Sequence, residues 1–183
     1  NAVDVAINTS IAPATNYTVN KSSDPESGTS VAPGQVVTYT IEVEQVGNAP
    51  AEAELTDDLS GVLDDATYNN DATATLGDVT VEGSDLAWNG TLPVGGTATI
   101  TYSVTVKDIA GLREGDYELG NVVTSDGCVV PEDCITDHQA GAYVFEKSSD
   151  PESGTTVESG DEIAYTLTVT HEGVATIENA TIT

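Results

Sequence analysis

The stretch KSSDPESGT, residues 21–29, recurs without a change at residues 147–155. Further identities follow both copies at the same spacing, as in Gly34/Gly160, Tyr39/Tyr165 and Val43/Val169. Identity at a fixed spacing of domain length is the signature of a tandem array, in which each copy is one structural unit. The chain is therefore expected to contain parts of successive repeats.

The repeat boundaries follow from this spacing. Asn1-Ala2-Val3 precedes the first copy much as Asn121-Val122-Val123 precedes the second. We expect residues 1–19 to be the C-terminal strand and connector of a preceding repeat, residues 20–143 to be a complete repeat, and residues 144–183 to be the N-terminal part of a following repeat. A unit of this size can bury a core without a metal or cofactor.

The hydrophobic pattern predicts strands. Apolar residues alternate with Thr, Ser and Glu at 37–43, 98–106 and 163–169, which is the period of half-buried strands. Turn residues such as Pro33-Gly34 and Gly95-Gly96 separate these runs. The pattern favours an all-β fold of tandem immunoglobulin-like antiparallel β-sandwich repeats.

Seven strands are expected in the complete repeat, at about 15–21, 35–46, 50–57, 72–81, 85–89, 97–107 and 117–125. The acidic stretch 58–70 is expected to be a surface loop, and 126–141 a connector into the next repeat. Trp88 is the only tryptophan and is expected in the core.

Charge excludes two classes of partner. The chain has 31 acidic residues against four Lys and Arg, a net charge of −27. Nucleic-acid binding depends on phosphate neutralisation by clustered cations, which this chain lacks. An anionic membrane would also repel it, and no apolar run is long enough to span a bilayer. Self-repulsion instead favours a soluble, extended array.

Two cysteines lie close together at positions 128 and 134, between turn residues. This spacing suits a small loop disulfide, Cys128–Cys134, in an oxidising extracytoplasmic compartment. A partial metal site with His138 is the alternative, but a closed structural zinc site needs four ligands.

The lysines give the sharpest hypothesis. Counting by two along the expected strands places Lys21 on the inward face, and likewise Asp57 and Asn121 on theirs. A buried ammonium requires a partner. These three residue types can form a spontaneous isopeptide bond, in which a neutral lysine amine attacks the asparagine carbonyl, a carboxyl group carries protons and ammonia leaves. A simple ion pair, or a lysine that reaches water, remains the alternative.

The neighbouring repeats contain the same residue types. Lys147 takes the place of Lys21 in the following repeat, and Asn1 takes the place of Asn121 in the preceding one. Burial would assist the reaction, because desolvation lowers the pKa of a lysine and raises that of a carboxyl group.

Other chemistry has weaker support. Weak calcium candidates are Asp57, Asp58, Asp64 and Asp65, but the EF-hand spacing is missing and a solvated acidic loop is the alternative. The motifs of a nucleophile elbow, a His-Glu-x-x-His zinc site and a phosphate-binding loop are missing from the sequence. We therefore expect no enzyme activity and no cofactor.

The order of motifs resembles a known family. The runs KSSDPESGT, PGQVVTYTI, LTDDLSGVLDDA, ITYSVTVKD and LGNVV are similar to the conserved repeat called "domain of unknown function eleven" in large surface proteins of prokaryotes. The version here looks like that of Gram-positive actinobacteria. The resemblance implies an immunoglobulin-like sandwich in a secreted stalk, adhesin or filament. By comparison with collagen-adhesin B-type domains, it implies a bond between Lys21 and Asn121 with Asp57 as proton shuttle, although those domains usually use Glu.

The predicted function is a structural repeat of an extracellular surface stalk, fibre or filament, whose partners are neighbouring copies of the repeat and the cell wall or a host surface. The repeats are either beads on one chain or units that share a strand. An adhesin module that binds host glycan or protein through its loops is the alternative function.

Overall fold

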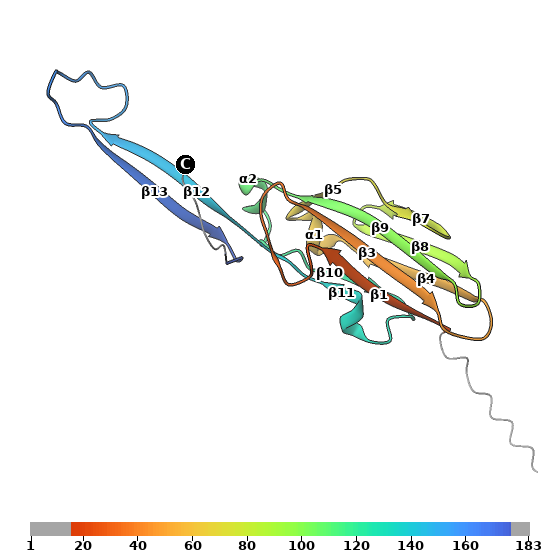
Figure 1. Ribbon diagram of the computed structural model, residues 1–183. Helices are drawn as coiled ribbons and strands as arrows, with labels where there is room; N and C mark the ends of the chain where they lie inside the picture. The colour runs from red at the N-terminus through yellow and green to blue at the C-terminus, as the bar shows by residue number, and fades with distance from the viewer. Residues whose placement is uncertain (1–15, 177–183) are drawn as a thin grey trace, which may run out of the picture.

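The computed structural model describes residues 16–176, which form an antiparallel β-sandwich and a long hairpin that extends from one end of it (Figure 1). This confirms the all-β sandwich expected from the alternating pattern. The expected tail of a preceding repeat, including Asn1, lies almost wholly outside the described residues.

The first sheet carries the strands with the clearest alternation. Its order is β1 (Tyr17–Asp24), β3 (Val36–Gln45), β9 (Thr97–Val106) and β5 (Ala66–Tyr68), and β6 (Thr73–Ala74) also pairs with β9. Every second side chain of β3 is buried, including Tyr39 and Ile41, because one face of the sheet covers the core.

The second sheet packs its inner face against the first. Its order is β11 (Ile135–Thr136), β10 (Asn121–Thr124), β4 (Ala51–Asp58), β8 (Asp85–Leu92) and β7 (Asp78–Glu82). Trp88 on β8 is 1% exposed and its indole Nε1 donates to the Leu76 carbonyl at 2.8 Å. The expectation that Trp88 anchors the core is confirmed.

Short helical turns connect the strands: α1 (Ser60–Leu63), α2 (Ile109–Leu112) and the 3-10 helix η1 (Pro131–Cys134). Within residues 16–176, none of the helices has the length and apolar character needed to cross a bilayer.

Two segments differ from the expectation. The stretch 58–70 is not only a loop, because it contains α1 and also β5, which pairs with β9. The stretch 126–141 is not a free connector, because η1 packs against β1 and β11 pairs with β10. Both segments bury apolar residues, among them Val62 and Cys134, in elements too short to show an alternating run.

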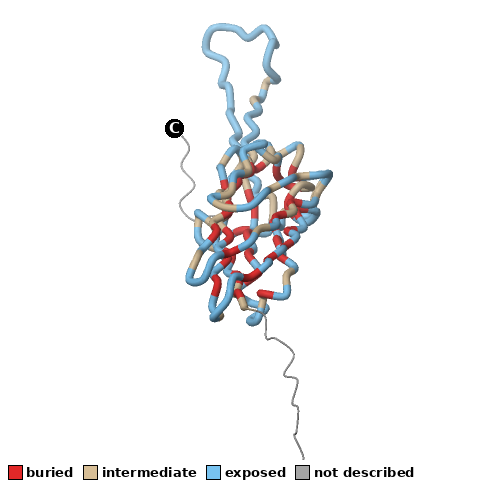
Figure 2. The backbone as a smooth tube through the Cα atoms, turned by 90° about the vertical axis from the view of Figure 1, so that its right-hand side faces the viewer, coloured by how far each residue is buried: buried red, intermediate tan, exposed pale blue. Residues whose placement is uncertain are grey.

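The hairpin leaves the sandwich without a linker. Strand β12 (Gln139–Asp150) first pairs in parallel with β2 (Ser30–Val31) of the sandwich and then continues outward to pair with β13 (Ala164–Gly173). Figure 2 shows the buried residues concentrated in the sandwich, whereas the hairpin beyond it is exposed.

Candidate functional site: a buried lysine centre

Four strands from both sheets bring four polar side chains to one point in the core. Lys21 lies on β1 and Tyr102 on β9 of the first sheet, and Asp57 on β4 and Asn121 on β10 of the second. Their exposures are 5%, 1%, 0% and 0%, in that order. The structure thus brings together the three residues that the alternation of the strands placed inward.

The Tyr102 hydroxyl is the hub of the centre. Lys21 Nζ donates to it at 3.1 Å, Asn121 Nδ2 donates to it at 2.7 Å, and it donates to Asp57 Oδ2 at 2.5 Å. Lys21 Nζ also forms a very short ion pair with the same Asp57 oxygen. The lysine and the asparagine therefore share one hydroxyl neighbour, and one carboxylate lies beside them.

The hydrogen bonding of the centre is incomplete. Asp57 Oδ1, Asn121 Oδ1 and the Tyr39 hydroxyl are buried and form no hydrogen bond within the described part of the chain. A buried polar atom without a partner costs about 1–3 kcal/mol, so three at one place require an explanation. Conversion of the Asn121 amide to an isopeptide would change which of these buried atoms need hydrogen-bond partners.

The electrostatics of the centre favour a reactive amine. Burial lowers the pKa of Lys21 to about 8, against the opposing attraction of Asp57. Burial also raises the pKa of Tyr102 above its ordinary range, and the Asp57 charge adds to this effect. Lys21 Nζ lies 5.1 Å and 5.5 Å from the ring centroids of Tyr39 and Tyr102. The lysine is thus held in a dry, aromatic site beside a proton acceptor, as an amine nucleophile requires.

Sequence reasoning missed both tyrosines. Tyr39 recurs in the repeat as Tyr165, and Tyr102 alternates with Ile100 and Val104, so both signals were present. An aromatic residue on the inner face of a strand usually packs, so the alternation of these strands alone predicts no polar role for either tyrosine. The two rings do stack, with centroids 5.1 Å apart.

The rest of the repeated stretch 21–29 is held by the end of the complete repeat. His138 is 1% exposed, and its Nδ1 donates to the Thr29 carbonyl at 3.1 Å, which leaves Nε2 to accept from the Ser23 hydroxyl at 3.0 Å. Asp137 N donates to Ser27 Oγ at 3.0 Å. Hydrogen bonds thus join residues 23–29 to residues 137–138 at the end of the repeat.

The cysteines and His138 do not form a common site. Cys128 and Cys134 are joined in a disulfide, and His138 is occupied by Ser23 and Thr29. The structure therefore favours the loop disulfide over the metal alternative. The disulfide loop lies on the sandwich, since Cys134 is 2% exposed and is packed beneath β1.

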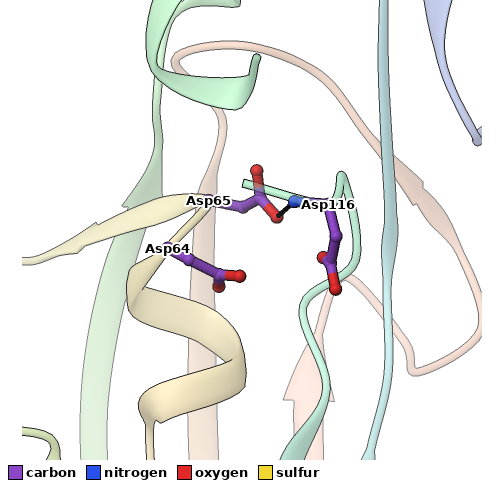
Figure 3. A group of neighbouring side chains, drawn as sticks. All are labelled: Asp64, Asp65 and Asp116. Carbon is purple, nitrogen blue, oxygen red and sulfur yellow. Dashed lines mark hydrogen bonds between the residues drawn. The ribbon is translucent and has the colours of Figure 1, made fainter. Parts of the chain in front are cut away.

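The acidic candidates for calcium do not gather as one group. Asp57 belongs to the lysine centre, and Asp58 Oδ1 accepts from Ser60 N at 2.9 Å. Asp64 and Asp65 lie with Asp116 instead, with one ligand atom of each within 4.8 Å of the others (Figure 3). Asp65 Oδ2 accepts from Asp116 N at 3.1 Å, so Asp65 holds the 115–116 turn in place.

Lys147 occupies the equivalent position in the hairpin. It pairs with Leu167 as Lys21 pairs with Ile41, and it lies over the Tyr165 ring at 4.7 Å as Lys21 lies over Tyr39. Unlike Lys21, it is exposed. Asn1, the other neighbouring-repeat candidate, lies outside the described residues.

The chain belongs to the family described as "Domain of unknown function (DUF7927)", whose model matches residues 16–141. The match spans the sandwich up to the outward turn of β12. No curated protein matches the chain.

Solved structures resemble the chain only remotely. The alkylpurine DNA glycosylase of Pseudomonas fluorescens, bound to DNA with an abasic site analogue, has 11% identity and a TM-score of 0.39, covering 69% of this chain and 30% of that one. The exo-β-N-acetylglucosaminidase of Vibrio harveyi has 12% identity, a TM-score of 0.32 and coverages of 68% and 17%. A non-cellulosomal cohesin of Archaeoglobus fulgidus has 10% identity, a TM-score of 0.29 and coverages of 68% and 86%. The chain thus spans less than a third of the first two proteins.

Proposed function

We propose that this chain is a structural repeat of an extracellular surface stalk, fibre or filament, and that each complete repeat is strengthened by an isopeptide bond. In the repeat described here the bond joins Lys21 Nζ to Asn121 Cγ. The observation that carries the proposal is the dry centre in which Lys21, Asp57 and Asn121 meet around one hydroxyl.

The position of the bond suits a load-bearing unit. It links β1 of one sheet to β10 of the other and closes a loop of about a hundred residues, which loop-closure arguments value at roughly 4–5 kcal/mol. Force that enters at β1 would pass directly to β10 and bypass the strands between them. The hydrogen bonds of His138 to Ser23 and Thr29 then tie the start of the repeat to the segment that leads into β12.

The junction to the hairpin suits a stiff array. Strand β12 belongs to both units, so no flexible linker intervenes. Arg113 forms a two-point ion pair with Glu172 on β13, and the amides of Val174 and Ala175 both donate to the Ala140 carbonyl at 3.1 Å. We propose that residues 144–183 open the next repeat, whose later strands would cover the exposed apolar face of the hairpin.

Composition supports a location outside the cell. The disulfide suits an oxidising compartment, and the net charge of −27 keeps an array extended. The resemblance of the motifs to the "eleven" repeats of actinobacterial surface proteins points to the same setting. The proposed partners are neighbouring copies, the cell wall or a host surface, and the proposed unit has no catalytic activity toward a substrate.

Intact mass spectrometry tests the bond on the full chain. The expected mass is one ammonia below that of the disulfide-bonded sequence, and fragmentation should recover a branched peptide containing Lys21 and Asn121. Asn121→Ala should restore the missing mass, whereas Asn48→Ala, on an exposed turn, should not. A full-length chain with an unmodified mass would refute the cross-link.

The alternative is an adhesin module that binds host glycan or protein through its loops. Glycan-array binding by the chain would favour it, whereas unbranched stiff rods of a longer array in electron micrographs would favour the stalk.

A further inference from the structure

Tyr102 is the group that contacts both nitrogens of the proposed reaction. Its hydroxyl lies 3.1 Å from Lys21 Nζ, the attacking atom, and 2.7 Å from Asn121 Nδ2, the atom that must leave. The same hydroxyl lies 2.5 Å from Asp57 Oδ2. The hydrogen bonds of Asp57 found in the structure run to Lys21 and Tyr102, and none runs to the leaving nitrogen.

This geometry leaves a gap in a mechanism that uses Asp57 alone. The amide Nδ2 must gain a proton before it can depart as ammonia, and Asp57 has no hydrogen bond to it through which to deliver one. The phenol bridges the two. Proton transfer requires hydrogen-bond distances of about 2.6–3.2 Å, and both links of the bridge are near or within this range.

We propose that Tyr102 is a catalytic residue of the isopeptide reaction, which passes a proton from the Asp57 carboxyl to the leaving nitrogen of Asn121. This inference rests on the proposed cross-link and assigns a role that the lysine, asparagine and aspartate do not fill.

The step balances in atoms and charge. Lys21 gives one proton to Asp57 Oδ2, and its neutral Nζ then forms a bond to Asn121 Cγ. In the resulting tetrahedral adduct Nδ2 is no longer conjugated with the carbonyl and becomes basic. Tyr102 donates its hydroxyl proton to Nδ2 and takes the proton from Asp57 Oδ2 in return. The Cγ–Nδ2 bond breaks, ammonia leaves, and the second proton lost by Nζ returns to Asp57, which ends as the neutral acid.

The surroundings keep Tyr102 suited to this role. Burial and the Asp57 charge raise the pKa of Tyr102, so the phenol stays protonated and returns to the same state after each transfer. Its ring is fixed by stacking on Tyr39 and by an edge contact with Tyr68, at centroid distances of 5.1 and 6.4 Å. The hydroxyl is thus held at the reacting atoms without needing to move.

The test is the rate at which freshly synthesised full-length chain loses ammonia, followed by intact mass after a short pulse of expression. Tyr102→Phe keeps the ring but removes the relay, and loss of a general acid should slow the reaction by about a hundredfold or more. Tyr17→Phe is the matched control, because Tyr17 is a buried first-sheet tyrosine whose hydroxyl contacts Ser125 at 3.3 Å. It should react at the wild-type rate.

A second measurement does not depend on the fold of Tyr102→Phe. Replacement of Tyr102 by 3-fluorotyrosine preserves the hydroxyl and the packing but makes the phenol a stronger acid and a weaker proton acceptor, so the rate of ammonia loss should change. If the wild type loses ammonia and the fluorinated chain reacts at an unchanged rate, the relay is wrong and the cross-link stands. If the wild type never loses ammonia, both proposals fail.

Discussion

The same nine residues occupy two settings in this molecule. In the first copy, residues 21–29 belong to a closed sandwich, and Lys21 is 5% exposed with Asp57 and Tyr102 as partners. In the second copy, residues 147–155 belong to a hairpin, and Lys147 is exposed. The strand pairing is equivalent in the two copies, since Lys21 lies opposite Ile41 and Lys147 opposite Leu167.

The comparison shows which features of the lysine site come from strand pairing alone and which come from the second sheet. Pairing of the strands and placement of a tyrosine ring beside the lysine occur in both copies. Within residues 16–176, burial, the carboxylate partner and the asparagine accompany Lys21 and not Lys147, because β4 and β10 provide them. We therefore propose that the cross-link between Lys21 and Asn121 forms only after the sandwich has closed.

The largest expected effect tests this difference directly. Lys21→Met should prevent the proposed cross-link, which loop-closure arguments value at roughly 4–5 kcal/mol, and should leave the buried Asp57 carboxyl without the lysine beside it. Lys147→Met is the matched control and should change the stability of the sandwich by less than about 0.5 kcal/mol. Thermal unfolding of both variants measures the contrast, and equal losses would show that the two settings are energetically alike.

The next effect concerns the hydrogen bonds that His138 forms with the repeated stretch 21–29. His138→Ala removes a buried side chain and two hydrogen bonds to Ser23 and Thr29, so we expect a loss of about 2–4 kcal/mol. His171→Ala, on the exposed hairpin, removes one bond to the Ala175 carbonyl and should cost under about 1 kcal/mol.

Hydrogen exchange shows which amides the side chain of His138 protects. In His138→Ala the amides of residues 23–29 should exchange faster, to a level near that of residues 149–155 in the wild type. Unchanged protection of residues 23–29 would show that His138 does not hold this stretch.

The sequence predicted the positions of the strands better than the way in which they pack into a sandwich. The alternation at 37–43 and 98–106 located β3 and β9, and counting by two placed Lys21, Asp57 and Asn121 inward correctly. These predictions succeed because the side-chain period of a strand is a local property. The inward faces of the strands alone do not bring the three residues to one point. That depends on the register of four strands that are distant in sequence.

Features that depend on tertiary contacts escaped prediction. Strand β11 and the helix η1 are too short to show a period, and their place on β10 and β1 follows from packing. Asp116 joined Asp64 and Asp65 because the 115–116 turn folds back over them, a contact between segments about fifty residues apart. Tyr102 was visible as a core residue, but its hydroxyl acquires a role only from its three neighbours.

A smaller effect depends on pH and concerns a buried carboxyl group of the sandwich. Burial raises the pKa of Asp65 from 3.8 to about 6. The folded chain therefore binds more protons at this group than the unfolded chain between these values, so its contribution to stability falls as pH rises through that window. Asp65→Asn should remove this fall and make the variant relatively more stable above pH 6 than at pH 4.

Urea unfolding of the wild type and of Asp65→Asn at several pH values measures the slope. An Asp65→Asn profile parallel to that of the wild type would show that Asp65 keeps its ordinary pKa in the fold.

The smallest effect lies at the boundary between the two settings. Arg113 and Glu172 form the ion pair that ties the α2 end of the sandwich to β13, and their side chains are 50% and 23% exposed. Exposed pairs contribute little to stability and are screened by salt, so Arg113→Gln should leave the unfolding of the sandwich nearly unchanged. What it should change is the hairpin, whose amides near residues 171–173 should exchange faster at low salt. High salt should produce the same increase in the wild type and none in the variant, because the interaction it screens is already gone. If the wild-type hairpin is insensitive to salt, the shared strand β12 and the backbone bonds to Ala140 hold the junction alone.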